Sequence, residues 1–206
     1  MPRILGRPFA RLPSLVVFDV DYTLWPMWCD THSRPPYRAA PDERVNMGRR
    51  ALTPAACQAV IDGSGAELRL YPEVPEVLGA LSACGVPYAL ASRTDRPEWL
   101  EQIASLLTVP AGAVAGEGHT ALWRAAAHRE MYPQSKLVHF LALAKASGVG
   151  CENMLFFDDE ARNSEVETLG VTFKLVDEDV GVTKALFLEG LEEFEAAAAA
   201  TEWRST

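Results

Sequence analysis

Two aspartates stand close together where the first apolar run of the chain ends. The segment SLVVFDVDYTLWP, residues 14–26, begins with the apolar run 15–18 and continues into Asp19, Asp21 and Thr23. Strand interiors are poor in aspartate, and two carboxylates this close repel each other unless a positive charge lies between them. A hard divalent cation such as Mg²⁺, which favours carboxylate and carbonyl oxygens, would remove that repulsion.

Polar side chains also follow two later apolar runs that are typical of buried strands. In an open parallel sheet the carboxyl ends of the strands meet at one edge, where ligands bind. We therefore expect these groups to join the two aspartates, together with a lysine that opens the helical pattern before the third run. A phosphate bound there would bridge the metal and the lysine, with a serine hydroxyl and backbone N–H groups on its other oxygens. The residues are Ser92, Arg93 and Thr94 after residues 86–91, Asp158, Asp159 and Glu160 after residues 153–157, and Lys136.

Apolar runs alternate with helical patterns along most of the chain. Near-continuous hydrophobic strands separated by helices are typical of a parallel sheet that is covered on both faces. We therefore predict an α/β fold, a Rossmann-like three-layer α/β/α sandwich with a mainly parallel sheet. Glycines after the helical patterns mark their ends. The expected strands are residues 15–20, 86–91, 153–157 and 171–176, the helical segments are residues 74–81, 137–144 and 160–169, and the glycines are Gly85, Gly148 and Gly170.

The composition indicates an ordinary globular protein. The chain has 206 residues, 49% hydrophobic and 23% charged, which suffices for one α/β domain but not for two. A net charge of −9 argues against a nucleic-acid partner, which would require a basic face. No apolar stretch approaches the roughly 20 residues that cross a bilayer, so we expect no membrane partner. The scattered cysteines favour reduced, packed thiols in a cytoplasmic protein; they are Cys29, Cys57, Cys84 and Cys151.

We predict a single domain that contains two segments without regular helical or strand patterns. The expected domain spans residues 14–200, after an N-terminal extension of residues 1–13 and before a tail of residues 201–206. The extension is rich in arginine, so the sequence leaves open whether it is a targeting signal. It lacks the length and serine content of a transit peptide. Residues 29–66, polar and rich in proline and arginine, are expected to form a short insertion or minimal cap, too short for a lid domain. Residues 101–126 contain a Gly/Ala-rich insertion that can alter the rim of the site.

Five ordered segments carry a resemblance to a known family. DVDYT after a hydrophobic strand resembles the D-x-D-x-T signature of the haloacid dehalogenase superfamily, and the later serine, lysine and acidic pair fit its other motifs in order. More closely, FDVDYTLWPMWCDTH, RLYPEVPEVL, GVPYALASRT, HREMYPQSK and FFDDEARN resemble the magnesium-dependent phosphatase-1 family. The resemblance runs from about residue 12 to 190 and is broken at residues 38–66 and 101–126. It implies a haloacid dehalogenase-like fold without a large cap domain.

The resemblance assigns catalytic roles to the residues at the sheet edge. It implies that Asp19 is the nucleophile and forms an aspartyl phosphate. Asp21 corresponds to the general acid that protonates the leaving oxygen and then serves as the base for water. Lys136 spreads the charge of the transferring group, and Ser92 binds phosphate. Arg93 is a candidate for contact with the substrate.

The resemblance also implies a ligand set for Mg²⁺. The ligands are the Asp19 carboxylate, the Asp21 backbone carbonyl and the Asp159 carboxylate, with water and phosphate completing six positions. Asp158 is expected to act through water, although the sequence leaves open which of the two adjacent acids binds the metal directly. Thr23 is expected to tie down the loop after the first strand.

The implied function is a Mg²⁺-dependent phosphomonoester hydrolase. We expect a monomer, although the sequence leaves the oligomeric state open. Its substrate would be a phosphorylated small molecule, a phosphoprotein or a glycated protein. The resemblance implies phosphotyrosine-like groups, sugar phosphates and fructosamine 6-phosphates, and the residues do not select among them. A phosphotransferase or phosphomutase on the same fold is the first alternative, and it would need a water-excluding lid. A phosphate-binding regulator without catalysis is the second, and the intact Asp19, Asp21 and Lys136 count against it.

Other aromatic and histidine side chains are expected to have structural roles. Trp25, Trp28 and Tyr37 lie among prolines, where aromatics either pin a loop or line the rim of a substrate site. The histidines are expected to be surface or packing residues rather than ligands. They are His32, His119, His128 and His139.

Overall fold

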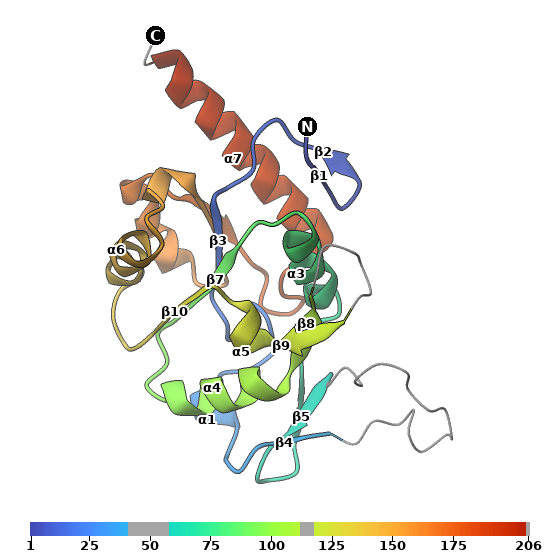
Figure 1. Ribbon diagram of the computed structural model, residues 1–206. Helices are drawn as coiled ribbons and strands as arrows, with labels where there is room; N and C mark the ends of the chain where they lie inside the picture. The colour runs from blue at the N-terminus through green and yellow to red at the C-terminus, as the bar shows by residue number, and fades with distance from the viewer. Residues whose placement is uncertain (41–57, 112–117, 205–206) are drawn as a thin grey trace.

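A five-stranded parallel sheet forms the centre of the protein (Figure 1). The computed structural model describes residues 1–40, 58–111 and 118–204. The predicted three-layer α/β fold is confirmed, because helices cover both faces of this sheet. The strand order is β10 (His128–Met131), β7 (Tyr88–Ser92), β3 (Leu15–Phe18), β11 (Met154–Asp158) and β12 (Thr172–Leu175).

Alternation of side chains along the strands builds two hydrophobic clusters, one on each face of the sheet. In β3, Val16 and Phe18 belong to one cluster, while Leu15 and Val17 belong to the other. The first cluster packs against α3 (Val74–Ala83), α4 (Pro97–Leu106) and α7 (Lys184–Arg204). The second packs against α6 (Lys136–Ser147) and the 3₁₀ helix η2 (Ala161–Leu169). All four side chains of β3 are buried, as expected for the central strand of a covered parallel sheet.

The register of the central strands aligns their carboxyl ends. Phe18 of β3 lies opposite Phe157 of β11 and Leu90 of β7. The residues that follow these positions therefore leave the sheet at the same edge, which is the ligand-binding edge of open parallel sheets. This alignment brings together the polar groups that follow the three strands.

The helix ends follow the predicted glycines, but one predicted helix is wound more tightly than an α-helix. Gly148 and Gly170 end α6 and η2 with positive φ angles of 72° and 88°, a backbone conformation that glycine adopts without steric cost. Residues 161–169 form a 3₁₀ helix, in which side chains three positions apart eclipse each other. This winding buries Asn163 and Val166 on the same side.

Several short elements were not expected from the sequence. The segment at 29–66 contributes to a three-stranded antiparallel sheet, and the segment at 101–126 contains a two-stranded antiparallel sheet and a short helix. Residues 41–57, which include Cys57, and residues 112–117 lie outside the described ranges. The elements are α1 (Cys29–His32), β4 (Arg38–Ala39), β5 (Ala59–Ile61), β6 (Glu67–Arg69), β8 (Thr108–Pro110), β9 (His119–Ala121), α5 (Leu122–Ala125) and the 3₁₀ helix η1 (Cys151–Asn153).

The N-terminal extension packs against the last helix. Its two short antiparallel strands are β1 (Arg3–Ile4) and β2 (Arg7–Pro8). Arg7 forms an ion pair with Glu192 of α7, and the backbone N–H of Arg11 donates to Glu195 at 3.1 Å. Helix α7 continues through residues 201–204, which we expected to be a tail. Within the described residues, no helix combines the length and apolarity needed to cross a bilayer.

Candidate active site

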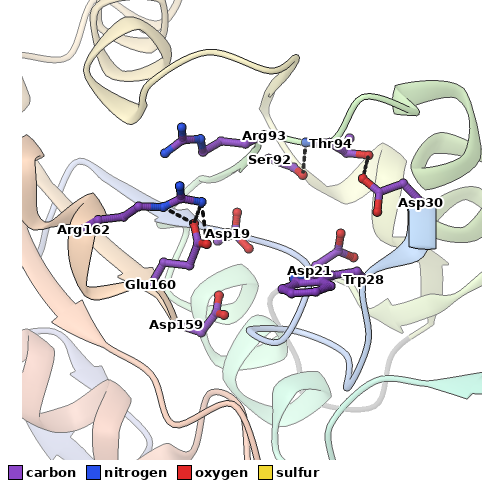
Figure 2. Close-up of a pocket in the computed structure, with 10 residues that line it drawn as sticks. All are labelled: Asp19, Asp21, Trp28, Asp30, Ser92, Arg93, Thr94, Asp159, Glu160 and Arg162. Carbon is purple, nitrogen blue, oxygen red and sulfur yellow. Dashed lines mark hydrogen bonds and ion pairs between the residues drawn. The ribbon is translucent and has the colours of Figure 1, made fainter. Parts of the chain in front are cut away.

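A cleft of about 200 Å³ opens at the carboxyl ends of β3, β7 and β11, as the strand-end pattern predicts. Figure 2 shows its lining: one side carries Arg93, Glu160 and Arg162, and the other carries Trp28, Asp30 and Thr94. The remaining lining residues are Asp19, Asp21, Ser92 and Asp159.

A fully buried lysine holds the first aspartate of the DVDYT segment. The Nζ atom of Lys136 lies 2.5 Å from Asp19 Oδ1 and 3.1 Å from Asp158 Oδ2, and it donates to the carbonyl oxygen of Ala91 at 2.5 Å. Burial disfavours the lysine charge, but the two carboxylates outweigh this effect and raise the pKa of Lys136. The lysine is therefore a fixed cation. Its position as the first residue of α6 aims it at the strand ends, as the sequence predicts.

The first acid of the adjacent pair supports the lysine and does not line the cleft. Asp158 is completely buried, and its two oxygens accept hydrogen bonds from Asn163 Nδ2 at 2.9 Å each. The backbone N–H of Glu160 also donates to Asp158 Oδ1 at 2.8 Å. With Lys136 as a further partner, the Asp158 carboxylate is occupied by protein groups. Sequence reasoning missed Asn163, although its place five residues after Asp158 in FFDDEARN was a visible signal.

The second acid of the pair faces the cleft. Asp159 Oδ1 accepts a hydrogen bond from Thr23 Oγ1 at 3.3 Å, so Thr23 links the loop after β3 to the acidic pair. Burial, followed by the negative charge of Asp158, raises the pKa of the Asp159 carboxyl to about 6. Within the described part of the chain, Asp159 has no ion-pair partner. A half-buried carboxylate without a cation beside it fits a divalent metal.

The donor set around this carboxylate suits Mg²⁺. Asp19 and Asp159 line the same cleft, and both offer the oxygen ligands that Mg²⁺ prefers. In the residues that the structure describes, no three His, Cys, Asp or Glu side chains are grouped closely enough to hold an ion by themselves. The predicted ligand set places only two carboxylates on the metal, together with a backbone carbonyl, water and phosphate, and it stays a prediction.

The second aspartate of DVDYT is held in a different environment. Asp21 Oδ1 accepts hydrogen bonds from Trp25 Nε1 at 2.5 Å and from the backbone N–H of Cys29 at 3.2 Å. Burial raises the pKa of the Asp21 carboxyl to about 7. Tyr22, which follows Asp21, has a φ of 54°, in the left-handed region that non-glycine residues seldom adopt. A carboxyl with a pKa near neutrality suits proton transfer in both directions.

The loop after β7 supplies the predicted serine and arginine. Ser92 Oγ accepts the backbone N–H of Thr94 at 3.2 Å, which leaves its own hydrogen available to a ligand. Arg93 donates to Asn163 Oδ1 at 3.2 Å and so connects this loop to the Asp158 network. Both side chains line the cleft together with Asp19.

The three aromatic candidates separate into different roles. Trp25 is completely buried and pins the loop through its bond to Asp21. Trp28 is 48% exposed and lines the cleft, so it belongs to the rim. Tyr37 forms a hydrogen bond with Ser33 at 2.7 Å and does not line the cleft. Sequence reasoning missed Asp30 and Arg162 as lining residues, because neither follows an apolar run that ends at the cleft.

A packing role for His139 is confirmed, because its buried ring lies behind the active-site lysine. Its Nε2 lies 3.0 Å from the carbonyl oxygen of Tyr132, whose ring it meets edge-on at 4.4 Å. Burial, followed by the charges of Lys136 and Arg93, lowers the pKa of His139 to about 4.

We expect this histidine to make stability fall in mildly acidic solution. The unfolded chain binds its proton near pH 6.5 and the folded protein near pH 4, so its stabilising contribution is complete above 6.5 and declines as the pH falls toward 4. Urea unfolding at pH 7.5 and at pH 5 measures how much unfolding free energy each protein loses between the two pH values. We expect this loss to be roughly 2 kcal/mol smaller in His139→Gln than in the wild type. The exposed His119→Gln should match the wild type. Equal losses in all three proteins would show that His139 does not titrate this way.

The sheet edge, the D-x-D pair and the lysine beside it define a hydrolase of the haloacid dehalogenase superfamily. A family model described as Acid Phosphatase matches residues 11–197. Human Magnesium-dependent phosphatase 1 is 41% identical over 189 residues, which cover 91% of this chain and 90% of the human protein. A HAD-like hydrolase superfamily protein of Schizosaccharomyces pombe is 37% identical over 163 residues, 79% of this chain and 85% of that protein.

A solved structure supports the same fold. The crystal structure of a HAD-superfamily hydrolase from Ehrlichia chaffeensis matches 90% of this chain and 97% of its own, with a TM-score of 0.52 and 12% identity. The chain therefore belongs to the acid phosphatase family of the haloacid dehalogenase superfamily, as the sequence motifs indicate. It is a magnesium-dependent phosphatase, and its substrate is a phosphorylated molecule.

Proposed function

We propose that the enzyme hydrolyses phosphomonoesters in two steps through an aspartyl phosphate on Asp19. The observation that carries this proposal is the position of Asp19, at the end of the central strand and 2.5 Å from Lys136 Nζ. The lysine holds one carboxylate oxygen, and Asp19 faces the cleft where an ester would bind. Burial raises the pKa of the Asp19 carboxyl, Lys136 opposes that rise, and Asp158 and Asp159 add to it. The charge of Lys136 also attracts the phosphate group to Asp19.

In the first step a carboxylate oxygen of Asp19 forms a bond to phosphorus while the ester P–O bond breaks. Asp21 gives its proton to the leaving oxygen. Its hydrogen bonds from Trp25 and from the backbone N–H of Cys29 both fall on Oδ1, which supports Oδ2 as the atom that would carry the transferred proton. Ser92 and Arg93 line the cleft on the β7 side and would bind the phosphate oxygens.

In the second step water attacks phosphorus and gives a proton to Asp21. The bond between phosphorus and Asp19 then breaks, which releases inorganic phosphate and restores both carboxyl groups. Asp19, Asp159 and the backbone carbonyl of Asp21 would hold Mg²⁺, which when bound neutralises negative charge on the carboxylates and the transferring phosphoryl group.

The substrate classes that we propose are phosphotyrosine-like groups and sugar phosphates, including fructosamine 6-phosphates on glycated proteins. The cleft lies at the surface, and Trp28 at its rim is half-exposed, which supports access for groups presented by a larger molecule.

The assignment of Asp159 to the metal predicts a specific defect. We expect Asp159→Asn to raise the Mg²⁺ concentration for half-maximal hydrolysis of p-nitrophenyl phosphate at least tenfold, because a charged metal ligand becomes neutral. Isothermal titration with Mg²⁺ should show the same weakening without any substrate. The matched control is Asp179→Asn, an exposed aspartate in the loop after β12. An unchanged Mg²⁺ requirement in Asp159→Asn would remove this residue from the metal site.

A further inference from the structure

The two walls of the cleft differ in how their charges are paired (Figure 2). On one wall, Arg162 forms hydrogen bonds to both oxygens of Glu160, at 2.5 and 2.7 Å. On the opposite wall, the Asp30 carboxylate has no cation partner within the described residues. The second wall therefore presents an unneutralised acceptor to whatever occupies the cleft.

Asp30 is held in a fixed position relative to the phosphate-binding loop. Its Oδ2 accepts a hydrogen bond from Thr94 Oγ1 at 3.2 Å, and its Oδ1 accepts one from Thr31 Oγ1 at 2.9 Å. Thr94 is buried, and its backbone N–H donates to Ser92 Oγ. A carboxylate offers about four acceptor positions, so the two threonines leave acceptor capacity for donors in the cleft.

An aromatic surface stands on the same wall as this carboxylate. The Trp28 ring is braced by Tyr22, edge-on at 5.5 Å, and by His32, stacked at 5.7 Å. These contacts hold a large apolar surface in place although nearly half of the residue is exposed. An apolar face beside a placed acceptor is a pattern that binds carbon chains bearing hydroxyl groups.

We propose that Asp30 determines specificity by accepting hydrogen bonds from hydroxyl groups of the leaving group. Of the substrate classes proposed above, phosphate esters of sugars and other polyols are then favoured over phosphotyrosine-like aryl esters, and over plain alkyl esters, which carry no further hydroxyl groups. This inference rests on the proposed phosphatase reaction and deepens it, because Asp30 takes no part in bond breaking. Its role is recognition of the group that departs.

A competing role for Asp30 acts through Asp21. The negative charge of Asp30 contributes, after burial, to the raised pKa of the Asp21 carboxyl. Loss of that charge would change proton transfer for every substrate equally. Recognition of hydroxyl groups would instead affect only the substrates that carry them. A pair of esters that differ in hydroxyl groups alone separates the two roles.

The experiment compares sorbitol 6-phosphate with hexyl phosphate, which share a six-carbon chain. We expect the wild type to show the higher kcat/KM for sorbitol 6-phosphate. In Asp30→Asn, kcat/KM for this ester should fall about tenfold, mainly through KM, because a charge-assisted hydrogen bond becomes a neutral one. The value for hexyl phosphate should stay within about twofold. The control Asp95→Asn removes the same charge from an exposed aspartate outside the cleft and should leave both values unchanged.

Three results would overturn the proposal. They are a wild type without preference for sorbitol 6-phosphate, equal losses for both esters in Asp30→Asn, and no loss for either ester. The wild-type preference alone tests the proposal if melting curves show that Asp30→Asn is unfolded. Failure of the underlying phosphatase reaction is distinguishable, since the wild type would then release phosphate from neither ester in the presence of Mg²⁺.

Discussion

Asp19→Asn should lose at least about a thousandfold in hydrolysis of p-nitrophenyl phosphate at saturating Mg²⁺. The amide has no charge and is a poor nucleophile, so no phosphoenzyme can form, and removal of a covalent nucleophile generally costs several powers of ten in kcat. The substitution also removes one ligand of the proposed metal. The loss should therefore remain when Mg²⁺ is raised further, because added metal cannot restore the nucleophile.

The fold should survive this substitution. Lys136 keeps its second carboxylate partner, Asp158, at 3.1 Å, and the β3 side chains around position 19 are unchanged. Melting curves and far-UV circular dichroism of the variant establish that the loss is chemical. Hydrolysis that continues undiminished in folded Asp19→Asn would contradict the assignment of the nucleophile.

Lys136→Met should damage both stability and activity. The side chain is fully buried between Asp19 and Asp158, so its removal leaves two buried carboxylates without their cation. Breaking a buried ion pair in this way costs about 3–5 kcal/mol, measurable by urea unfolding. Activity should fall by roughly a hundredfold to a thousandfold, the usual effect of removing one group that stabilises developing charge.

A matched lysine on the same helix provides the control for that variant. Lys145 is exposed in the last turn of α6, and Lys145→Met should change unfolding free energy by less than about 0.5 kcal/mol. Adding Asp158→Asn to Lys136→Met should recover part of the stability, since one uncompensated charge is removed, but none of the activity. Equal stability of the two lysine variants would contradict the role of Lys136 as the buried cation between Asp19 and Asp158.

The core of the fold and the place of the site were predictable from local patterns. Apolar runs that end in acids located β3 and β11, and the strand-end rule for parallel sheets brought Asp19, Ser92 and Asp159 to one edge. Lys136 was predictable in the same way, because a helix that precedes β11 begins at that edge. The residue types and their order along the chain were enough for these conclusions.

Other parts depend on tertiary contacts that local patterns do not contain. Strand β10 has four half-buried residues, so the apolar signal of a central strand is absent from it. Asp158 is buried beside Lys136, whereas Asp159 lines the cleft. This difference depends on the hydrogen bond that Asn163, in the 3₁₀ helix η2, donates to Asp158. Asp30 enters the cleft only because α1 packs beside the loop after β7, where Thr94 bonds to it.

The central claim is that Asp19 carries the phosphoryl group during turnover. Its most direct test is rapid acid quenching of the enzyme with substrate and Mg²⁺, followed by borohydride reduction and peptide mass spectrometry. Reduction converts an aspartyl phosphate to homoserine, and we expect homoserine at position 19, with none in the Asp19→Asn control. Active enzyme in which residue 19 stays unmodified, or in which another residue is reduced, would contradict the account.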